Sequence, residues 1–310
     1  MTSPLLSLPG AVAGAGIDAP VAAHYGSLYG EQTALVAGDG FVDLSHHDVV
    51  RVSGSDRLQW LHDLTTQYFL DLPQKTWTQA LILSPQGHVE HAFAGVDDGE
   101  SFTAATEPGA AAALVEFLDR MRFMSRVEVA DVTAEVALTY RPSAGHELIP
   151  REKLTRYAEA AGPACGLWAY EALRIARGEP RLGLDTDHRS IPNELGWIDS
   201  AVHMDKGCYR GQETVARVHN LGRPPRRLTL LHLDGSENRL PEVGTDLTHG
   251  EKVVGVVGTS ARHHELGPIA LAIVKRNVPV DAQLDAGGLP AAQEVIVDPD
   301  VGLHVRQERR

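Results

Sequence analysis

Residues 206–213 read Lys-Gly-Cys-Tyr-Arg-Gly-Gln-Glu, the most distinctive stretch of the chain. The thiol of Cys208 has a cation two residues away on each side, Lys206 and Arg210. Both cations would stabilise the thiolate, as would the N-terminus of a helix that begins near Gly211. Most free cysteines are instead small buried hydrophobic residues. The stretch therefore predicts either a reactive thiol or a buried one, and composition alone favours neither.

The segment before this motif, residues 179–210, is rich in loop-forming residues and concentrates acidic side chains. Asp185 and Glu194 delimit a stretch that also holds a histidine, and Trp197 follows shortly after. A planar heterocycle with amide groups would be bound by an aromatic wall and one carboxylate. A polar surface loop with Asp-type turns accounts for the same residues equally well. Both interpretations stay open.

After the motif the sequence pattern changes twice. Residues 212–219 are expected to form a short helix, and residues 220–227, NLGRPPRR, are expected to form a charged linker. The arginines of this linker could grip an anionic tail, because guanidinium groups pair bidentately with carboxylates. Exposed basic runs are more often simply solvated, and we favour that interpretation. Beyond the linker, short β-type runs separated by turns predict a small β-barrel.

The part of the chain before residue 179 mixes helical and strand-like patterns. Two apolar runs flank Ser84-Pro85-Gln86-Gly87, which predicts a β-hairpin with its turn at these four residues. Helical periodicity covers the segments 55–64, 108–121, 151–162 and 167–178.

The N-terminal residues show neither pattern. Residues 1–28 are rich in Ala, Gly and Pro and lack periodicity, which predicts a flexible N-terminal tail. The predicted organisation is therefore a tail over residues 1–28, an α+β core over residues 29–222 and a C-terminal β-barrel domain over residues 223–310.

The charge of the chain limits its partners. Its 310 residues include 28 Lys and Arg against 41 Asp and Glu, which leaves a net charge of −13. Such acidity argues against broad binding to nucleic acid or to an anionic membrane, because both need a basic surface. The sequence lacks an apolar run of about 18 residues that could span a membrane. Its first residues also lack the basic side chains of a signal or transit peptide. We therefore expect a cytoplasmic protein with no direct nucleic-acid or membrane partner.

The two cysteines, Cys165 and Cys208, are too few for a disulfide framework and suit a reducing compartment. Cys165 has no charged neighbours, so we interpret it as structural. The 15 histidines include adjacent pairs, but side chains next to each other on a strand diverge, and we predict no metal site. A resident iron–sulfur cluster normally needs about four cysteine ligands, so any cluster would be held briefly or shared.

The segment KGCYRGQETVAR, residues 206–217, resembles the signature of the YgfZ family. That family is a branch of the folate-binding fold shared with the T-protein (aminomethyltransferase) of the glycine cleavage system. Further similarities follow in the same order along the chain, in VSGSDRLQWLHDLTTQ, SPQGHVEHAFAG and PACGLWAYEALRIARGEPRLG. The similarities cover about residues 40–227. The resemblance implies an α+β, multi-lobed folate-binding core around a central folate site, with a C-terminal β-barrel domain.

The resemblance also implies a function. YgfZ-type proteins serve the assembly or repair of iron–sulfur clusters in client enzymes, with tetrahydrofolate as the associated cofactor. The expected partners are therefore those enzymes or assembly proteins, together with folate. The functional residue of the family is the motif cysteine, which is Cys208 here, with Lys206 and Arg210 beside it. The residues expected to contribute to the cofactor site are Gly207, Tyr209, Gly211, Gln212 and Glu213 of the motif, and Asp185, Glu194 and Trp197 of the preceding loop.

Two positions depart from the T-protein pattern. This chain has His91 or Ala92 at the position of the T-protein's catalytic aspartate, and Glu90 would point to the other face of the strand. Ala176 stands where the T-protein has a pterin-binding glutamate, so that Glu179, Asp185 or Glu194 would have to supply a carboxylate. A folate-dependent aminomethyl or one-carbon transferase is therefore the alternative function. A binding module that uses the fold only as a scaffold is the third.

Overall fold

The computed structural model describes residues 1–302, which divide into two compact units. The first unit comprises Met1–Leu64, Tyr68–Ala80 and His91–Glu171. The second comprises Thr65–Gln67, Leu81–Glu90 and the chain from Ala172 onward. This division differs from the predicted boundary at residue 222, because the hairpin turn and the loop-rich segment fold together with the barrel.

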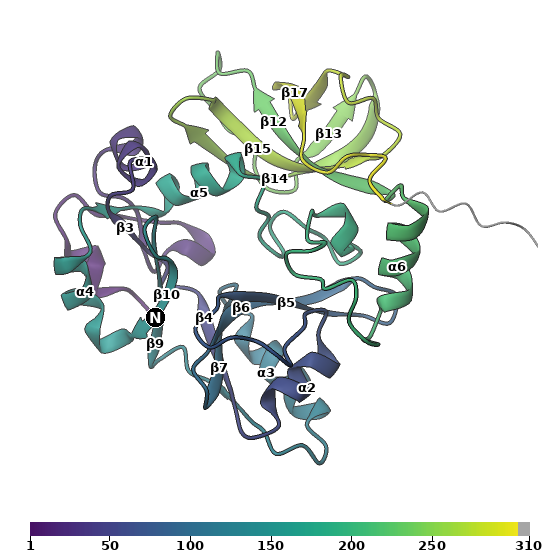
Figure 1. The fold of residues 1–310 in the computed structure, drawn as a ribbon. Coiled ribbons are helices and arrows are strands. Elements are labelled where there is room, and N and C mark those ends of the chain that lie inside the picture. Colours follow the sequence, from purple (N-terminus) through teal and green to yellow (C-terminus); the bar gives the residue numbers. More distant parts are fainter. Residues whose placement is uncertain (303–310) are drawn as a thin grey trace, which may run out of the picture. The chain divides into compact units, whose positions relative to one another are not determined.

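The first unit is built from short helices and two main sheets (Figure 1). One sheet has the order β10-β9-β3-β11, and the other has the order β5-β6-β7-β4-β8. Strands β5 and β6, like helix α5, continue into the second unit. The elements are α1 (Leu28–Val36), β3 (Phe41–Asp43), β4 (Asp48–Ser53), α2 (Arg57–Leu64), β5 (Thr78–Leu83), β6 (Val89–Asp97), β7 (Ser101–Thr106), α3 (Ala111–Met121), β8 (Glu128–Asp131), β9 (Val136–Arg141), β10 (Gly145–Pro150), α4 (Leu154–Ala160), β11 (Ala164–Cys165) and α5 (Leu167–Ala176).

The predicted flexible tail over residues 1–28 is wrong. These residues form the 3-10 turns η1 (Pro4–Ser7) and η2 (Gly16–Asp18) and the strand pair β1 (Val12–Ala13) and β2 (Ala22–His24). Leu5 is 1% exposed and packs in a core cluster with Phe41 and Leu154. The sequence suggests a tail because its apolar residues follow no period, but irregular segments can be ordered by tertiary packing alone.

The second unit contains a closed six-stranded barrel with the order β12-β15-β14-β13-β16-β17, as the sequence predicts (Figure 1). Strand β12 pairs antiparallel with both β15 and β17, which closes the barrel. Leucine, valine and alanine side chains fill its interior, including Leu231, Leu247 and Val257. The last eight residues of the predicted 223–310 domain lie outside the described residues. The elements of this unit are η4 (Pro192–Glu194), α6 (Gln212–Leu221), β12 (Arg226–Leu233), β13 (Asp246–His249), β14 (Lys252–His263), β15 (Gly267–Lys275), β16 (Leu284–Ala286) and β17 (Pro290–Val295).

Other predicted elements are present, with shifted ends. The hairpin turn is confirmed, because the Gly87 amide donates to the Ser84 carbonyl between β5 and β6. Helix α6 runs two residues further than predicted, and β12 already begins at Arg226, so only residues 222–225 connect them. Within residues 1–302, the helices lack the length and apolar character needed to cross a bilayer.

A buried ion pair attaches the loop-rich segment of the second unit to its barrel. The Arg174 guanidinium donates to Asp185 Oδ2 at 2.8 Å and to Thr259 Oγ1 on β14 at 2.6 Å. Asp185 Oδ1 accepts from both the amide and the hydroxyl of Thr259. The side chains of Arg174 and Asp185 are 2% and 0% exposed, so both charges of the pair lie away from solvent.

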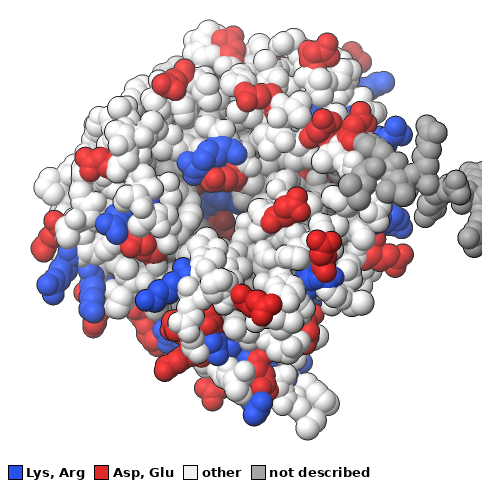
Figure 2. Space-filling model, viewed as in Figure 1, with Lys and Arg blue, Asp and Glu red and all other residues white. Residues whose placement is uncertain are grey.

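Charged side chains of both signs share the molecular surface. On the face shown in Figure 2, Lys and Arg side chains lie scattered among Asp and Glu side chains and form no continuous basic area. Although acidic residues are in excess, many of them pair locally with arginines. Examples are Arg126 with Asp56 and Arg141 with Glu147.

We predict that Leu5→Ala lowers the free energy of unfolding by about 2–5 kcal/mol, because it leaves a cavity in a filled core. Urea denaturation followed by circular dichroism measures this change. Ile17→Ala is the control, since Ile17 is half exposed on the same segment. An effect of Leu5→Ala no larger than that of Ile17→Ala would show that the N-terminal segment does not pack as described.

We predict that Asp185→Asn destabilises the protein by about 3–5 kcal/mol, because the buried Arg174 guanidinium then loses the carboxylate to which it donates. The double variant Arg174→Met/Asp185→Asn should be more stable than Asp185→Asn alone. Thermal and urea unfolding provide the measurement. Arg177→Gln, which breaks the exposed pair of Arg177 with Glu179, is the control and should change stability by less than about 0.5 kcal/mol. Equal effects of the two single variants would contradict a buried role for Asp185.

Candidate functional site

The motif loop, residues 206–211, lies in the second unit directly before α6 and against the hairpin turn. Gly211 makes this contact possible. Its φ is +82°, and a Cβ at this position would lie 2.5 Å from the Ser84 carbonyl oxygen. Gly87 has a φ of +84°, and its Cβ would lie 2.8 Å from Cβ of Thr214 on α6. Two glycines thus let the backbones of the motif and the turn approach closely.

Lys206 anchors the other end of the loop. Its ammonium donates to the Thr65 carbonyl at 2.5 Å and to the Gln67 carbonyl at 3.1 Å. It also lies 5.2 Å from the ring centroid of Tyr209, within cation–π range. Both side chains are buried. Burial raises the pKa of Tyr209 to about 12, so its hydroxyl is neutral at physiological pH.

Cys208 is exposed, although the neighbouring Tyr209 and the nearby Lys206 are buried. The space next to Gly207 is also open, since a Cβ there would meet no atom within 4 Å. Of the two alternatives that the sequence leaves open, the structure thus shows an accessible thiol rather than a buried one. The reactivity of that thiol stays a prediction. Cys165 is buried, and burial raises its pKa to about 12, with smaller contributions from Glu31 and Asp39.

Arg210 pairs with a carboxylate that the sequence did not suggest. Its Nη1 lies 3.0 Å from Oε2 of Glu90 on β6, and both side chains are about one-third exposed. The Glu90 carboxylate partly neutralises Arg210, while the Lys206 ammonium is directed toward carbonyl oxygens. Both cations of the motif therefore have oxygen partners other than the thiol. The sequence signal for this pair is that Glu90 lies three residues after the hairpin turn. That signal becomes informative only when the turn is known to contact the motif.

Gln212 and Glu213 form the first turn of α6, with Glu213 exposed and Gln212 half-buried. Helix α6 therefore begins four residues after Cys208 rather than at it. The acidic side chain of Glu213 suits this end of a helix, where the backbone dipole is positive.

The loop carboxylates predicted as cofactor ligands already have arginine partners. Asp185 is bonded to Arg174, and Glu194 accepts from Arg226 at 2.8 Å and 3.0 Å. Glu179 pairs with Arg177. Trp197 is buried in the same segment. Residues 190–195 of the loop are buried, whereas Asp187, His188 and Arg189 are exposed, so the loop is partly a buried segment and partly a polar surface loop. Its role in binding a cofactor stays a prediction.

Arg226 makes the central ion pair of this segment. It binds Asp187 at 2.6 Å in addition to Glu194. Burial acts to raise the pKa of Asp187, but hydrogen bonds from Arg226 and the Arg189 amide hold that pKa well below its usual range. The prediction of a solvated linker is therefore wrong at Arg226. This residue begins strand β12, and its charge is paired with carboxylates that lie far away in the sequence.

The chain was compared with family profiles, with curated proteins and with solved structures. No family profile matches the chain. A chloroplastic protein of Arabidopsis thaliana, named as a candidate transferase, is 24% identical over 76% of this chain and 65% of its own length. The mitochondrial iron–sulfur cluster assembly factor IBA57 homolog of Mycosarcoma maydis is 25% identical over 60% of this chain and 55% of its own length.

The tRNA-modifying protein YgfZ of Yersinia enterocolitica is 40% identical over 77 residues, which are 24% of this chain and 23% of that protein. The matched stretches thus span less than two thirds of these relatives. Among solved structures, the glycine cleavage system aminomethyltransferase T from Bartonella henselae superposes with a TM-score of 0.79 over 98% of both chains, at 16% sequence identity. That match shows the T-protein fold. By sequence the chain is similar to YgfZ- and IBA57-type proteins, and by fold it is similar to the T-protein.

Proposed function

We propose that this chain is a YgfZ-type factor for the assembly or repair of iron–sulfur clusters in client enzymes, acting through Cys208. The exposed thiol on an anchored loop carries the proposal. Contacts of Lys206 with two carbonyls and of Gly211 with the hairpin turn hold the loop at both ends, while the sulfur between them faces solvent. An immobilised, accessible thiol can meet a partner at low entropic cost. The name of the IBA57 relative supports this class of function, and the YgfZ relative is named as a tRNA-modifying protein.

Cys208 would act as one ligand among several. A cluster needs about four thiolate ligands, and Cys165 is buried. Within residues 1–302, no group of three or more His, Cys, Asp or Glu side chains could hold a metal ion. The remaining ligands would therefore come from the client or from an assembly protein. Binding of Cys208 to iron releases the thiol proton to solvent, so the thiolate is the form that acts.

Tetrahydrofolate belongs to this proposal as a ligand suggested by the family. The structure offers a poor fit for it in the predicted loop, because Glu179, Asp185 and Glu194 are each bonded to an arginine. Binding through any of them would compete with its arginine partner. We therefore assign no chemical step to folate. The cytoplasmic location likewise stays a prediction, since the names of two relatives place them in chloroplasts and mitochondria.

The transferase alternative has less support from the structure. It needs a carboxylate facing the folate at the position of His91 or Ala92, and the nearest one, Glu90, is held by Arg210. Formation of methylene-tetrahydrofolate from an aminomethyl donor tests this alternative directly, and turnover by the purified protein would favour it.

We expect that Cys208→Ser fails to restore cluster-dependent enzyme activities in a strain that lacks the gene, because serine does not provide a thiolate. The wild-type gene should restore them. Immunoblotting must show equal amounts of both proteins. Cys165→Ala is the matched control and should restore activity wherever it accumulates, since Cys165 is inaccessible. Full recovery with Cys208→Ser would exclude the proposed mechanism.

We predict that Glu90→Gln accelerates alkylation of Cys208 by iodoacetamide at pH 7 by about twofold to fivefold, because Arg210, two residues from Cys208, then loses the carboxylate that its Nη1 contacts. Arg210→Gln should slow the reaction, and the effect should weaken as salt rises. Mass spectrometry of the modified peptide measures the rate across pH 6–9. Glu159→Gln, an exposed site in the first unit, should leave the rate unchanged. Identical rates for all variants would show that Arg210 does not influence the thiol.

A further inference from the structure

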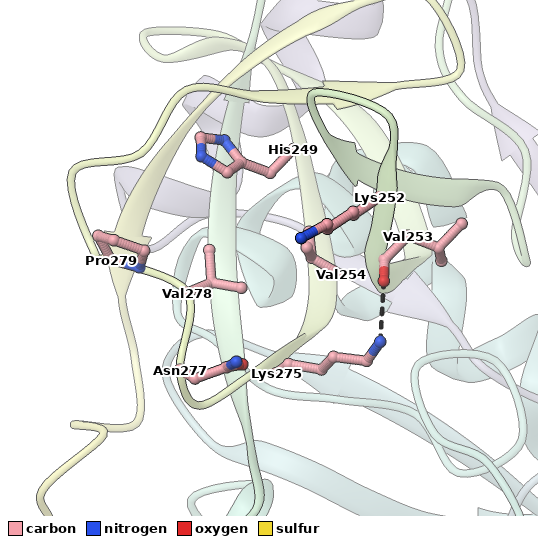
Figure 3. Close-up of a pocket in the computed structure, with 8 residues that line it drawn as sticks. All are labelled: His249, Lys252, Val253, Val254, Lys275, Asn277, Val278 and Pro279. Atoms are coloured by element: carbon pink, nitrogen blue, oxygen red, sulfur yellow. Dashed lines mark hydrogen bonds between the residues drawn. The ribbon is translucent and has the colours of Figure 1, made fainter.

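The barrel carries a hollow of about 460 Å³ on the surface formed by β13, β14 and the turn after β15 (Figure 3). Its polar lining consists of His249, Lys252, Lys275 and Asn277, and its apolar lining includes Val254 and Val278. The lining contains no carboxylate. The chain has a net charge of −13, but this hollow is lined by two lysines and a histidine. The local charge is therefore opposite in sign to the net charge of the chain.

Two of the donors in this hollow, Lys275 and His249, are held by backbone carbonyls. The Lys275 ammonium donates to the Val253 carbonyl at 2.8 Å, and its side chain extends toward that carbonyl, away from Asn277 (Figure 3). Figure 3 also shows the Lys252 ammonium pointing into the space beside Val254 and toward the side of His249 and Val278. His249 Nδ1 lies 3.1 Å from the Gln283 carbonyl. Because a carbonyl only accepts, Nδ1 carries the proton of that bond, and Nε2 is left for a ligand.

The turn after β15, which lines the hollow, is held in place by the buried side chain of Arg227. Arg227 is 0% exposed, and its guanidinium donates to the carbonyls of Lys275, Arg276 and Val278. It also donates to the side chain of Gln293, whose amide in turn donates to the carbonyls of Pro279 and Ala282. The segment that supplies Lys275, Asn277 and Val278 is therefore fixed, and a ligand would not have to order it.

The charge of Arg227 has no negative partner in the described part of the chain. All its hydrogen bonds go to neutral oxygens, and its Nε has no hydrogen-bond partner. Burial lowers the pKa of Arg227, but a guanidinium stays charged at neutral pH. An uncompensated buried cation raises the positive potential of its surroundings, and that potential reaches the turn that lines the hollow.

We propose that this hollow binds a small organic anion, with a phosphate or carboxylate head at Lys252 and Lys275 and an apolar body against Val254 and Val278. The anion supplies the negative charge that Arg227 lacks, and its head accepts charge-assisted hydrogen bonds from the two ammonium groups. The volume exceeds that of an inorganic ion and leaves room for the apolar part. This site is independent of Cys208 and of the function proposed above.

Titration of the full-length, ¹⁵N-labelled protein with phenyl phosphate and, separately, with phenylacetate tests the proposal. We expect saturable shifts of the backbone signals of Val253, Lys275 and Asn277, with a dissociation constant of about 1 mM or below. Preference for phenyl phosphate identifies a phosphate head, and preference for phenylacetate identifies a carboxylate head. Inorganic phosphate should bind more weakly than phenyl phosphate, because it makes no contact with the apolar lining.

Lys252→Gln should weaken binding by about tenfold while leaving the bond between Lys275 and Val253 in place. Lys252→Gln/Lys275→Gln should weaken it further. The control is Lys153→Gln/Arg156→Gln, which removes the same charge from exposed positions of the first unit and should bind like the wild type. The absence of shifts up to about 10 mM ligand would overturn the proposal. So would an equal loss of affinity in the control, which would indicate only a general effect of charge.

Discussion

The second unit is organised by positive charges that are removed from water and must be met by oxygen atoms. Arg174, Lys206 and Arg227 are buried, and the Arg226 side chain is 20% exposed. A buried charge that loses its partner costs several kcal/mol. Each of these cations therefore determines the position of the segment that supplies its oxygens. In a unit assembled from three separate stretches of chain, such contacts specify which stretches meet.

The exposure of Cys208 is a consequence of this arrangement. Lys206 points inward to the carbonyls of Thr65 and Gln67, and Tyr209 is buried beside it. Anchors two residues before and one residue after the cysteine leave the sulfur on the outer side of the loop. The close contact of Gly211 with the hairpin turn fixes the other end of the loop. The burial of Lys206 and Tyr209 and the close backbone contact of Gly211 thus together hold the loop on which the Cys208 thiol is exposed.

Sequence patterns predict the elements whose signal is local. The turn at Ser84–Gly87, the barrel strands and the helix after Gly211 follow from turn residues and apolar periodicity, and the structure confirms them. The T-protein-like fold was predictable because the motif resembles a known family. The order of residues 1–28 was not, because Leu5 is buried by contacts with Phe41 and Leu154 that no local pattern records.

The candidate site shows the same limit. Its motif residues could be named from the sequence, but the pairing of Arg210 with Glu90 joins positions 120 residues apart. Likewise, the loop carboxylates look available in the sequence because their arginine partners lie elsewhere: Glu194 meets Arg226 32 positions later. Charge pairing over such separations depends on the topology, so composition alone cannot tell a free carboxylate from a neutralised one.

Two adjacent residues, Arg226 and Arg227, show how strongly charge pairing depends on the fold. Neighbouring residues on a strand point to opposite faces, so identical side chains enter different surroundings. Arg226 reaches two carboxylates, which raise its pKa against the opposing effect of burial. Arg227 reaches only neutral oxygens, and burial lowers its pKa. One arginine thus ends as a neutralised link between the loop and the barrel, and the other keeps an unmatched charge. A sequence that places two cations side by side can therefore build both a structural ion pair and a source of positive potential.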